Sequence, residues 1–179
     1  MGKVSDVPPA ALIAGILFKD EENYTIAVKM LIEQFGPIEK KSPVFDFDKT
    51  DYYAAEMGEA LKKQFFCFNR PISLESLPEI KLFTNQAELK LARKDKDNPL
   101  RTVNIDPGYV TLSKLVLATT KDYSHRIFIG RGIFAETTLR FLKRTFTALE
   151  TTYPDYRTPL AIDFFNEVRE FVKRRQSHF

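Results

Sequence analysis

The sequence predicts one domain of the α+β class, and three features of its 179 residues support this. Segments with strand and helix patterns follow one another in the order strand, helix, strand, strand, helix, strand. The remaining third adds further strand patterns and ends in an amphipathic helix pattern. The length suits a single domain with a substantial buried core. We therefore expect a flexible polar tail over residues 1–9 and one domain over residues 10–179.

The first predicted unit is a strand followed by a helix. Ala10 to Phe18 is a nearly continuous apolar run, which is typical of a strand buried on both faces. Asp20 then suits a helix N-cap, and apolar residues recur at helical spacing from Tyr24 to Phe35. Gly36-Pro37 ends this helix, because glycine suits the left-handed position after a helix and proline cannot continue it.

The middle of the chain completes a recognisable order of elements. A long antiparallel hairpin is expected from about Phe45 to Arg70, with Gly58 near its turn and Pro71 at its end. A helix pattern from Leu77 to Leu91 and a strand pattern from Thr102 to Asp106 follow. Together with the first unit, this order matches a ferredoxin-like βαββαβ core.

The C-terminal third is expected to extend this core with antiparallel strands and a terminal helix. Strand patterns cover Ile127 to Ile129, Ile133 to Leu142 and Thr145 to Leu149, and Lys143-Arg144 suits a tight turn between the last two. The terminal helix is expected to begin at Thr158-Pro159, with threonine as the cap and proline in the first position.

The residues with the most chemistry lie in the stretch from Arg101 to Arg140. Asp106-Pro107-Gly108 predicts a turn, because proline fixes φ at about −65° and glycine accepts a positive φ. The run from Lys121 to Arg126 is polar except for Tyr123, and it separates two apolar runs. We therefore expect this run to lie at the surface or to line a cleft.

These residues define a candidate site. His125 is the better of two histidines for proton transfer near neutral pH, since His178 lies at the terminus. Lys121 and Arg126 could hold a phosphate or carboxylate, because arginine offers a bidentate fork. The full set comprises the candidate catalytic residues His125, Glu136 and Asp106 and the candidate ligand-binding residues Lys121, Arg126, Asn104 and Tyr109.

Each of these residues also has a purely structural interpretation. His125 could hydrogen-bond a loop, and Asp106 could bond the backbone of its own turn. Lys121 and Arg126 could pair with nearby carboxylates, and Glu136 faces either solvent or a polar site. Several tyrosines could stack on a ring of a ligand, or pack in the interior with satisfied hydroxyl groups: Tyr52, Tyr53, Tyr109, Tyr153 and Tyr156.

The sequence predicts no metal centre and no cofactor. Cys67 is the single cysteine, so an internal disulfide and a cysteine-based zinc site are excluded. Its place in an apolar strand predicts an inert, buried thiol. Asp46, Asp48 and Asp51 could ligate Mg²⁺ or Ca²⁺, but the same pattern is found in an ordinary amphipathic edge strand.

Charge and hydropathy narrow the class of protein and its expected location. The formal net charge of +3 is mild and does not by itself indicate a nucleic-acid partner. No stretch approaches the ~20 apolar residues of a membrane span, and Leu12 to Phe18 is too short for the core of a signal peptide. With an unpaired cysteine, these features predict a cytoplasmic protein without a membrane partner.

Five segments carry a resemblance to a known family. They are FGPIE, FDKTDYYAAEMG, IKLFTN, NIDPGYVTLSKLVLATTKDYSHRIFIGRGIFAETTL and TYPDYRTPLAIDFFNEVRE. Together they resemble a bacterial family catalogued as domain of unknown function DUF4416, over nearly the whole chain. Some similar sequences carry the label "GTP-binding protein". This chain lacks the G-x-x-x-x-G-K-[ST] phosphate loop, and Thr120-Lys121-Asp122 lacks the spacer of the guanine-reading [NT]-K-x-D pattern.

Two functions remain open from the sequence. In the first, the protein binds a small anionic ligand, such as a nucleotide or a phosphate compound, at the Lys121, His125 and Arg126 site, with or without catalysis. In the second, it is a non-catalytic module that binds RNA or a protein through its sheet. The chain lacks the aromatic K/R-G-F/Y-G/A-F-V-x-F/Y strand of a typical RNA-recognition sheet, which favours the first function.

Overall fold

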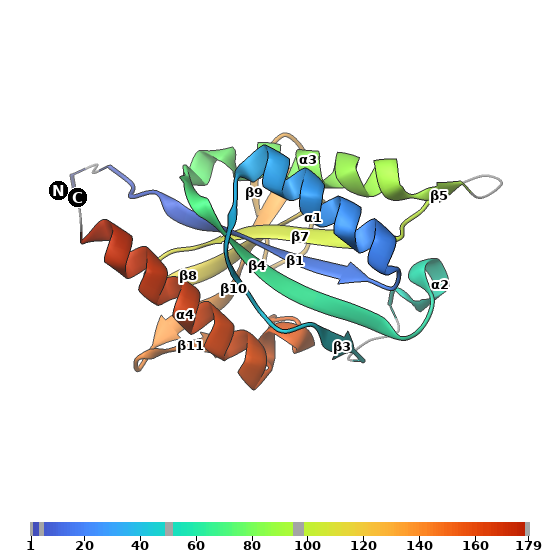
Figure 1. The fold of residues 1–179 in the computed structure, drawn as a ribbon. Helices are drawn as coiled ribbons and strands as arrows, with labels where there is room; N and C mark the ends of the chain where they lie inside the picture. The colour runs from blue at the N-terminus through green and yellow to red at the C-terminus, as the bar shows by residue number, and fades with distance from the viewer. Residues whose placement is uncertain (1, 4–5, 49–51, 95–98, 178–179) are drawn as a thin grey trace.

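The structure is a computed structural model that describes residues 2–3, 6–48, 52–94 and 99–177. Within these residues the protein has a mixed α+β fold, in which long helices pack on an antiparallel sheet (Figure 1). The helices and strands follow in this order: β1 (Ala10–Phe18), α1 (Glu21–Phe35), β2 (Ile38–Lys41), β3 (Phe45–Phe47), α2 (Ala54–Met57), β4 (Leu61–Ile72), η1 (Leu74–Ser76), α3 (Leu77–Leu91), β5 (Arg93–Lys94), β6 (Pro99–Leu100), β7 (Val103–Val110), β8 (Lys114–Thr119), β9 (Ile127–Gly130), β10 (Ile133–Leu142), β11 (Thr145–Ala148), η2 (Pro154–Arg157) and α4 (Pro159–Gln176).

The main sheet has nine strands among the described residues. Its order is β11-β10-β8-β7-β1-β4-β2, while β3 pairs with β4 and β9 pairs with β10. Each of these pairings is antiparallel. β1 lies in the interior of the sheet, and all nine of its residues are buried, as its apolar run predicts.

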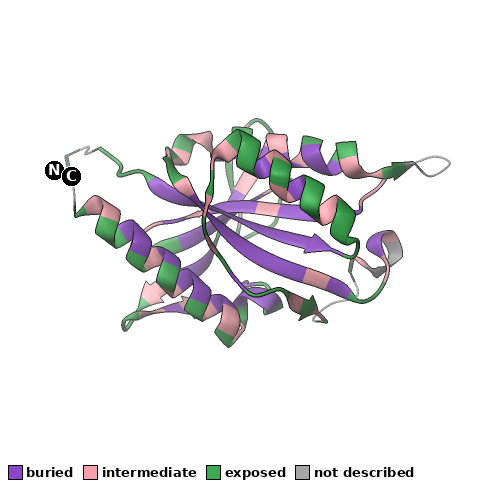
Figure 2. Ribbon diagram, viewed as in Figure 1, coloured by how far each residue is buried: buried purple, intermediate pink, exposed green. Residues whose placement is uncertain are grey.

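Helices cover both faces of the sheet, and two hydrophobic cores result. Figure 2 shows the buried strands between the partly exposed helices. Ile13 of β1 belongs to the core under α4, together with Phe165. Leu12 and Ile16 belong to the opposite core, under α1 and α3. Because successive residues of a strand point to opposite faces, one central strand serves both cores.

The predicted helix boundaries are confirmed by the capping contacts. The Asp20 side chain accepts hydrogen bonds from the backbone at the start of α1, and Gly36 ends the helix with φ at +89°. Thr158 caps α4 by accepting a hydrogen bond from the backbone N–H of Ala161. The sequence signals at these ends are local, so they determine the boundaries without help from tertiary contacts.

The predicted hairpin from Phe45 to Arg70 is only partly right. β3 does pair with β4, but α2 lies between them, and Gly58 follows α2. β4 also continues through Pro71 instead of ending there. The pairing of β2 with β4 extends only as far as Phe68, so a proline beyond that point removes no hydrogen bond from the β2 side.

The predicted turn at Asp106-Pro107-Gly108 is wrong. All three residues lie within β7, which pairs with β1 from Val103 to Val110. Gly108 is needed for a close approach between strands, since a Cβ there would lie 2.2 Å from the carbonyl oxygen of Val116 on β8. The Pro-Gly pair therefore marks a place where the neighbouring strands β7 and β8 approach each other closely.

The C-terminal extension is confirmed. β9, β10 and β11 occupy the predicted segments, and Lys143 and Arg144 have positive φ values of 48° and 69° at the turn between the last two. β8, formed by the apolar run before the polar loop, connects this extension to β7.

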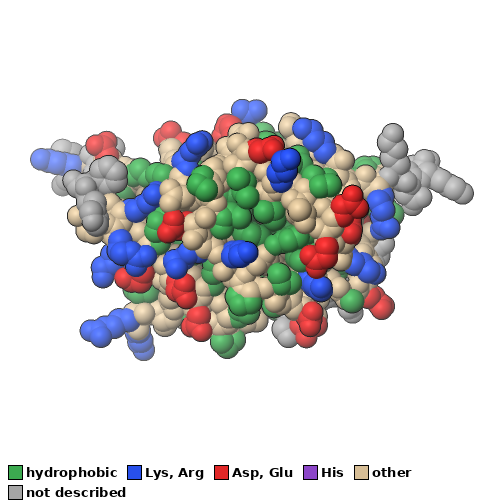
Figure 3. Space-filling model, viewed as in Figure 1, with side chains coloured by type: hydrophobic (Ala, Val, Ile, Leu, Met, Phe, Trp, Pro, Cys, Tyr) green, Lys and Arg blue, Asp and Glu red, His purple; other side chains and the backbone are tan. Residues whose placement is uncertain are grey.

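The surface carries charges of both signs. Figure 3 shows Lys and Arg side chains interspersed with Asp and Glu on the face viewed there, around a central group of hydrophobic side chains. This mixture agrees with the mild net charge of +3. In the described part of the chain, no helix is both long and apolar enough to cross a membrane.

Candidate functional site

A cleft opens where β8 separates from β7. β8 pairs with β7 only at residues 108–110, whereas β7 continues alongside β1 as far as Val103. Pro107 lies at the point of separation. The N–H groups of a strand alternate between its two edges, so Pro107 occupies the same edge as Ile105, which faces away from β1. Because proline has no N–H, the ladder with β8 ends here.

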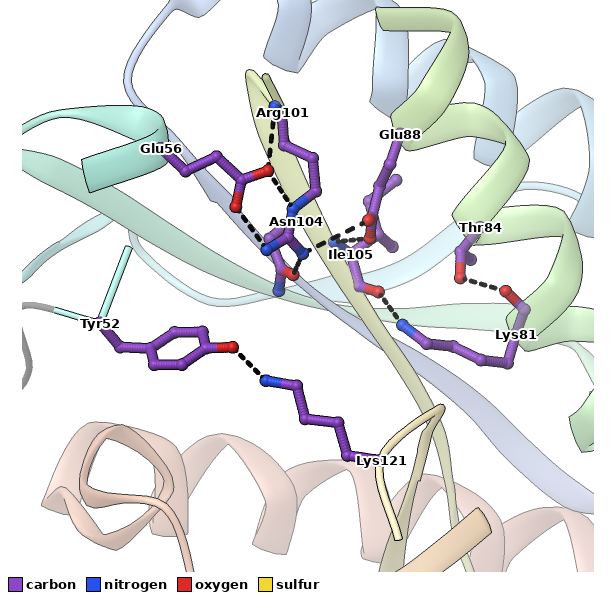
Figure 4. A network of polar contacts seen from close by, with 9 residues as sticks. All are labelled: Tyr52, Glu56, Lys81, Thr84, Glu88, Arg101, Asn104, Ile105 and Lys121. Atoms are coloured by element: carbon purple, nitrogen blue, oxygen red, sulfur yellow. Dashed lines mark hydrogen bonds and ion pairs between the residues drawn. The ribbon is translucent and has the colours of Figure 1, made fainter. Parts of the chain in front are cut away.

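Side chains of α3 replace the missing strand along this edge. The Glu88 carboxylate accepts a hydrogen bond from the Ile105 N–H at 2.7 Å, and the Lys81 ammonium donates to the Ile105 carbonyl at 3.0 Å (Figure 4). Both backbone groups of a buried residue are thereby satisfied. Burial raises the pKa of Glu88, against the attraction of Lys81. These two hydrogen bonds to the backbone hold the Glu88 and Lys81 side chains at the cleft.

The cleft is small and lined by charged groups. Its volume is about 110 Å³, and its walls come from α3, β7, the loop after β8, β10 and the segments around Tyr53 and Tyr153. A water molecule occupies about 30 Å³ in the liquid, so the cleft has room for one small polar ligand or for roughly four water molecules. Six charged side chains are among those that line it, three cationic and three anionic: Lys81, Arg101, Lys121, Glu88, Asp106 and Glu136.

Asp106 is held in its charged form by a buried lysine. The Lys63 Nζ lies 2.7 Å from Asp155 Oδ2 and 3.4 Å from Asp106 Oδ2. Burial alone would lower the pKa of Lys63, but the two aspartates raise it above its ordinary value. Burial would also raise the pKa of Asp106, but Lys63 and Lys81 hold it below its ordinary value. The Asp106 carboxylate of the cleft is therefore ionised, and the buried ammonium group of Lys63 balances its charge.

Glu136 organises the opposite wall of the cleft. Its Oε2 lies 2.6 Å from His125 Nε2 and accepts a hydrogen bond from Arg126 Nε at 3.0 Å. The other Arg126 nitrogens donate to the Lys121 carbonyl at 3.1 Å and to the Tyr153 hydroxyl at 2.6 Å. All three guanidinium nitrogens are thus engaged within the protein. Arg126 consequently holds the loop and Glu136 in place.

Asn104 presents a buried amide to the cleft. Arg101 forms a bidentate pair with Glu56 at 2.8 and 2.6 Å, and its third nitrogen donates to Asn104 Oδ1 at 2.7 Å (Figure 4). This contact directs the amide nitrogen of Asn104 away from Arg101. Asn104 is only 4% exposed, and in the described part of the chain its Nδ2 makes no hydrogen bond of normal geometry, although the Asn104 side chain lies close enough to Asp106 to help lower the pKa of that carboxyl. Such a buried, unpaired donor calls for an explanation.

The structure brings most of the predicted site residues together. Asn104, Asp106, Lys121 and Glu136 line the cleft. His125 and Arg126 reach it through their contacts with Glu136.

Tyr109 does not belong to this group. It lies on the other face of β7 from Asn104 and Asp106. Residues that are an odd number of positions apart on a strand point to opposite faces. There it packs with Val116 and Leu77. Its position in the chain, close to Asp106, is therefore a poor guide to its surroundings.

Membership of a family rests on a single match. The domain of unknown function DUF4416 matches residues 8–171. The chain belongs to this family. No curated protein and no solved structure matches it.

Several charged residues of the cleft escaped sequence reasoning. Lys63 shares a strand face with Phe65 and Cys67, so period-two alternation would have predicted a buried lysine. Lys81, Thr84 and Glu88 recur at spacings of three and four, so they form a buried polar stripe on one face of α3. Asp155 and Arg101 gave no comparable local signal.

A larger hollow lies elsewhere in this DUF4416 domain. It measures about 650 Å³ and lies between the start of β1 and the end of α4, against mainly apolar residues such as Pro71, Phe171 and Val172. Its arginines are positioned by other contacts, as when Arg175 donates to Asn69 Oδ1 at 2.9 Å. The charged side chains and the buried amide are gathered instead at the smaller cleft.

The described residues that the sequence offers for metal binding and for thiol chemistry lie outside the cleft. Among the residues that the structure describes, no group of three His, Cys, Asp or Glu side chains could hold a metal ion. Asp51, one of the three aspartates considered, lies outside those residues. Cys67 is buried, and burial raises the pKa of its thiol to about 12, as expected of an inert core thiol.

Proposed function

We propose that this DUF4416 domain binds a small molecule through an anionic group, a phosphate or a carboxylate, in the cleft between β7 and β8. The observation that carries the proposal is the Asn104 amide, which is oriented by Arg101 and makes no hydrogen bond of normal geometry through its Nδ2 to the described residues. A buried unpaired donor costs about 1–3 kcal/mol. An oxygen atom of a bound anion would remove this cost.

Two lysines supply positive charge to the same place. The Lys81 ammonium lines the cleft and makes one hydrogen bond, to the Ile105 carbonyl, although a lysine has three hydrogens to donate. Lys121 lies at the mouth, where its ammonium contacts the Tyr52 hydroxyl (Figure 4). With the amide of Asn104, these groups form a donor-rich wall that suits phosphate or carboxylate oxygens.

The carboxylates of the cleft are compatible with an anionic ligand, because each is already balanced by the protein. Asp106 faces the buried Lys63, and Glu136 is paired with Arg126. Glu88 accepts the Ile105 N–H and lies 3.7 Å from Arg101. The hydrogen-bond donors of the cleft therefore remain available for a ligand, and they favour one with a negative charge.

The volume limits what enters the cleft. About 110 Å³ accommodates a phosphate or carboxylate group, whereas drug-sized ligands occupy pockets of about 300–1,000 Å³. A nucleotide would insert a phosphate and leave its base outside, near Tyr52, which is 58% exposed.

Binding is better supported than catalysis. His125 is the candidate proton carrier, and Glu136 orients its Nε2, but His125 does not itself line the cleft. A catalytic function would require the reacting atom of the ligand to approach Glu136 or Asp106, which do line it.

We also infer that the core is ferredoxin-like. The chain order β1, α1, β2 and β3, β4, α3, β7 supports this, since it follows the βαββαβ pattern. The neighbouring positions of β7, β1, β4 and β2 in the sheet support it as well. In this interpretation α2 is an insertion between β3 and β4.

The alternative function, a module that binds RNA or a protein through its sheet, has less support. β1 is buried along its whole length, and helices pack on both faces of the sheet. A sheet covered on both faces offers little strand surface on which bases could stack.

Titration with inorganic phosphate and with acetate tests the proposal. Isothermal titration of the wild type is expected to give saturable binding, and thermal melting is expected to give a rise in Tm by mass action. Lys81→Met is expected to weaken binding at least about tenfold, which corresponds to about 1.4 kcal/mol. Lys90→Met is the matched control, because Lys90 is exposed on the same helix.

A second pair of variants protects this test against misfolding of the first. Lys121→Met removes an exposed ammonium at the mouth of the cleft, and Lys114→Met removes an exposed one at the other end of β8. Only the first change should weaken binding. If neither anion binds the wild type, or if all four variants bind equally well, the cleft is not an anion site.

A further inference from the structure

We propose that the ligand of the cleft is a small zwitterion of the amino-acid type, whose carboxylate meets Asn104 and Lys81 and whose ammonium group is held by Asp106. This inference rests on the proposed function, which supplies the donors for the anionic group. It adds a second recognition element, the Asp106 carboxylate, and thereby names the class of ligand.

The first argument is the charge balance of the cleft. Three cationic and three anionic side chains line it, so its formal charge is zero when all six are ionised. A polyphosphate would bring several negative charges that the lining does not balance, whereas a zwitterion brings none. Buried charges are tolerated only when they are paired. A cleft that has both charges and no net charge therefore favours a ligand that also carries a positive and a negative group.

Asp106 is the carboxylate with capacity to spare. Glu136 Oε2 already contacts both His125 and Arg126, and Glu88 already accepts the Ile105 N–H. Asp106 is contacted by Lys63 at 3.4 Å and by the neighbouring Asn104 side chain, which helps to lower its pKa, and 27% of its side chain is exposed. A carboxylate offers about four lone-pair sites. An ammonium group entering the cleft would therefore find its acceptor at Asp106.

Asn104 and Asp106 are spaced for one small molecule. They lie two residues apart on the same face of β7, about 6–7 Å along the strand. Their side chains are therefore neighbours, so one small ligand can accept a hydrogen bond from Asn104 and donate one to Asp106. The amino and carboxyl groups of an α-amino acid lie on one carbon atom, so they suit this short span.

Lys81 reinforces the same polarity. Its ammonium approaches the cleft from α3, fixed by the Ile105 carbonyl (Figure 4). The anionic end of the ligand would lie between Lys81 and the Asn104 amide. The cationic end would lie toward Asp106 and the strand side, so the ligand has one preferred orientation.

The volume restricts the side chain of the amino acid. About 110 Å³ equals the space of roughly four water molecules. Glycine, alanine or serine fit this space, and an aromatic amino acid does not.

Matched ligands test the inference on the unaltered chain. L-alanine and propionate differ by the amino group, so isothermal titration of the wild type with each measures what that group contributes. L-alanine is expected to bind at least about tenfold more tightly than propionate. Asp106→Asn is expected to abolish the preference for L-alanine over propionate, so that the variant binds the two ligands with equal affinity. Asp163→Asn, at an exposed position of α4, is the control and should change neither affinity.

The outcomes separate the two proposals. If propionate or phosphate binds and L-alanine binds no better than propionate, the zwitterion is overturned while the anion site stands. If neither L-alanine, propionate nor phosphate binds the wild type at millimolar concentration, both proposals fail. If Asp106→Asn does not fold, the wild-type comparison of L-alanine with propionate still decides the inference.

Discussion

Asp106 and Lys63 determine each other's charge, and this coupling predicts how stability depends on pH. The pKa of Asp106 is below its ordinary value in the folded protein, so the unfolded chain binds more protons in the window between the two values. Stability therefore rises with pH through this window and is fully present above an ordinary aspartate pKa of about 3.9. We expect the free energy of unfolding to fall as pH decreases below that value.

Asp106→Asn is expected to reduce this acid sensitivity, because the variant has no carboxyl group to protonate at residue 106. Urea unfolding of the wild type and the variant across the acidic range measures the difference. Identical pH profiles for the two proteins would show that Asp106 does not supply this dependence.

Arg126 is expected to matter more for stability than its place in a loop suggests. Its side chain is 4% exposed and pairs with Glu136, which is buried. Arg126→Ala would remove the guanidinium partner of a buried carboxylate, and breaking a buried ion pair costs about 3–5 kcal/mol. Lys173→Ala, at an exposed position of α4, is the control and should change the free energy of unfolding by less than about 0.5 kcal/mol. Comparable losses in urea unfolding would contradict this role of Arg126.

The thiol of Cys67 is expected to be unreactive in the folded protein. Burial raises its pKa to about 12, so almost no thiolate exists near neutral pH. Iodoacetamide should leave the native protein unmodified and should alkylate the chain fully in concentrated urea. Rapid alkylation without denaturant would mean that β4 opens readily.

At the scale of the elements, the junction of β7 and β8 is the most sensitive point. A Cβ at residue 108 would lie 2.2 Å from the Val116 carbonyl oxygen, so Gly108→Ala forces the two strands apart. We expect a loss of about 1–3 kcal/mol or more. Gly2→Ala is the control, because no heavy atom lies within 4 Å of a Cβ at that position. Equal stabilities in urea would show that the strands adjust without cost.

Local signals predicted the elements that depend on local contacts. The ends of α1 and α4 follow from Asp20, Gly36 and Thr158, whose capping partners lie within four residues. Pro107-Gly108 was misinterpreted because a Pro-Gly pair in isolation indicates a turn. Its actual role depends on β8, which contacts β7 through the fold.

The candidate site was predictable in part, for the same reason. The polar loop stands out against its apolar neighbours, and it leads directly to His125, Arg126 and Glu136, which lie within 11 residues of one another. Lys63 and Asp155 meet although they are 92 residues apart. No local pattern links them, so the second half of the charge network becomes visible only in the folded chain.

At the scale of the whole molecule, one sheet carries both hydrophobic cores. β1, β4 and β7 each contribute residues to the core under α4 and to the core under α1 and α3. A strand cannot leave one core without also leaving the other. We therefore expect the protein to unfold in a single cooperative transition, as small single domains usually do.

Two phenylalanine variants test this shared sheet. Phe165 is completely buried under α4, so Phe165→Ala should cost about 3–5 kcal/mol. Phe35 is only partly buried in the opposite core, where it contacts Phe68 and Phe83, so Phe35→Ala should cost less. In urea, circular dichroism and tyrosine fluorescence should report one midpoint for each variant, because either change destabilises strands that both cores share. Separate midpoints for the two probes would mean that the cores unfold independently, and the central strands would then not couple the α4 face to the α1 and α3 face.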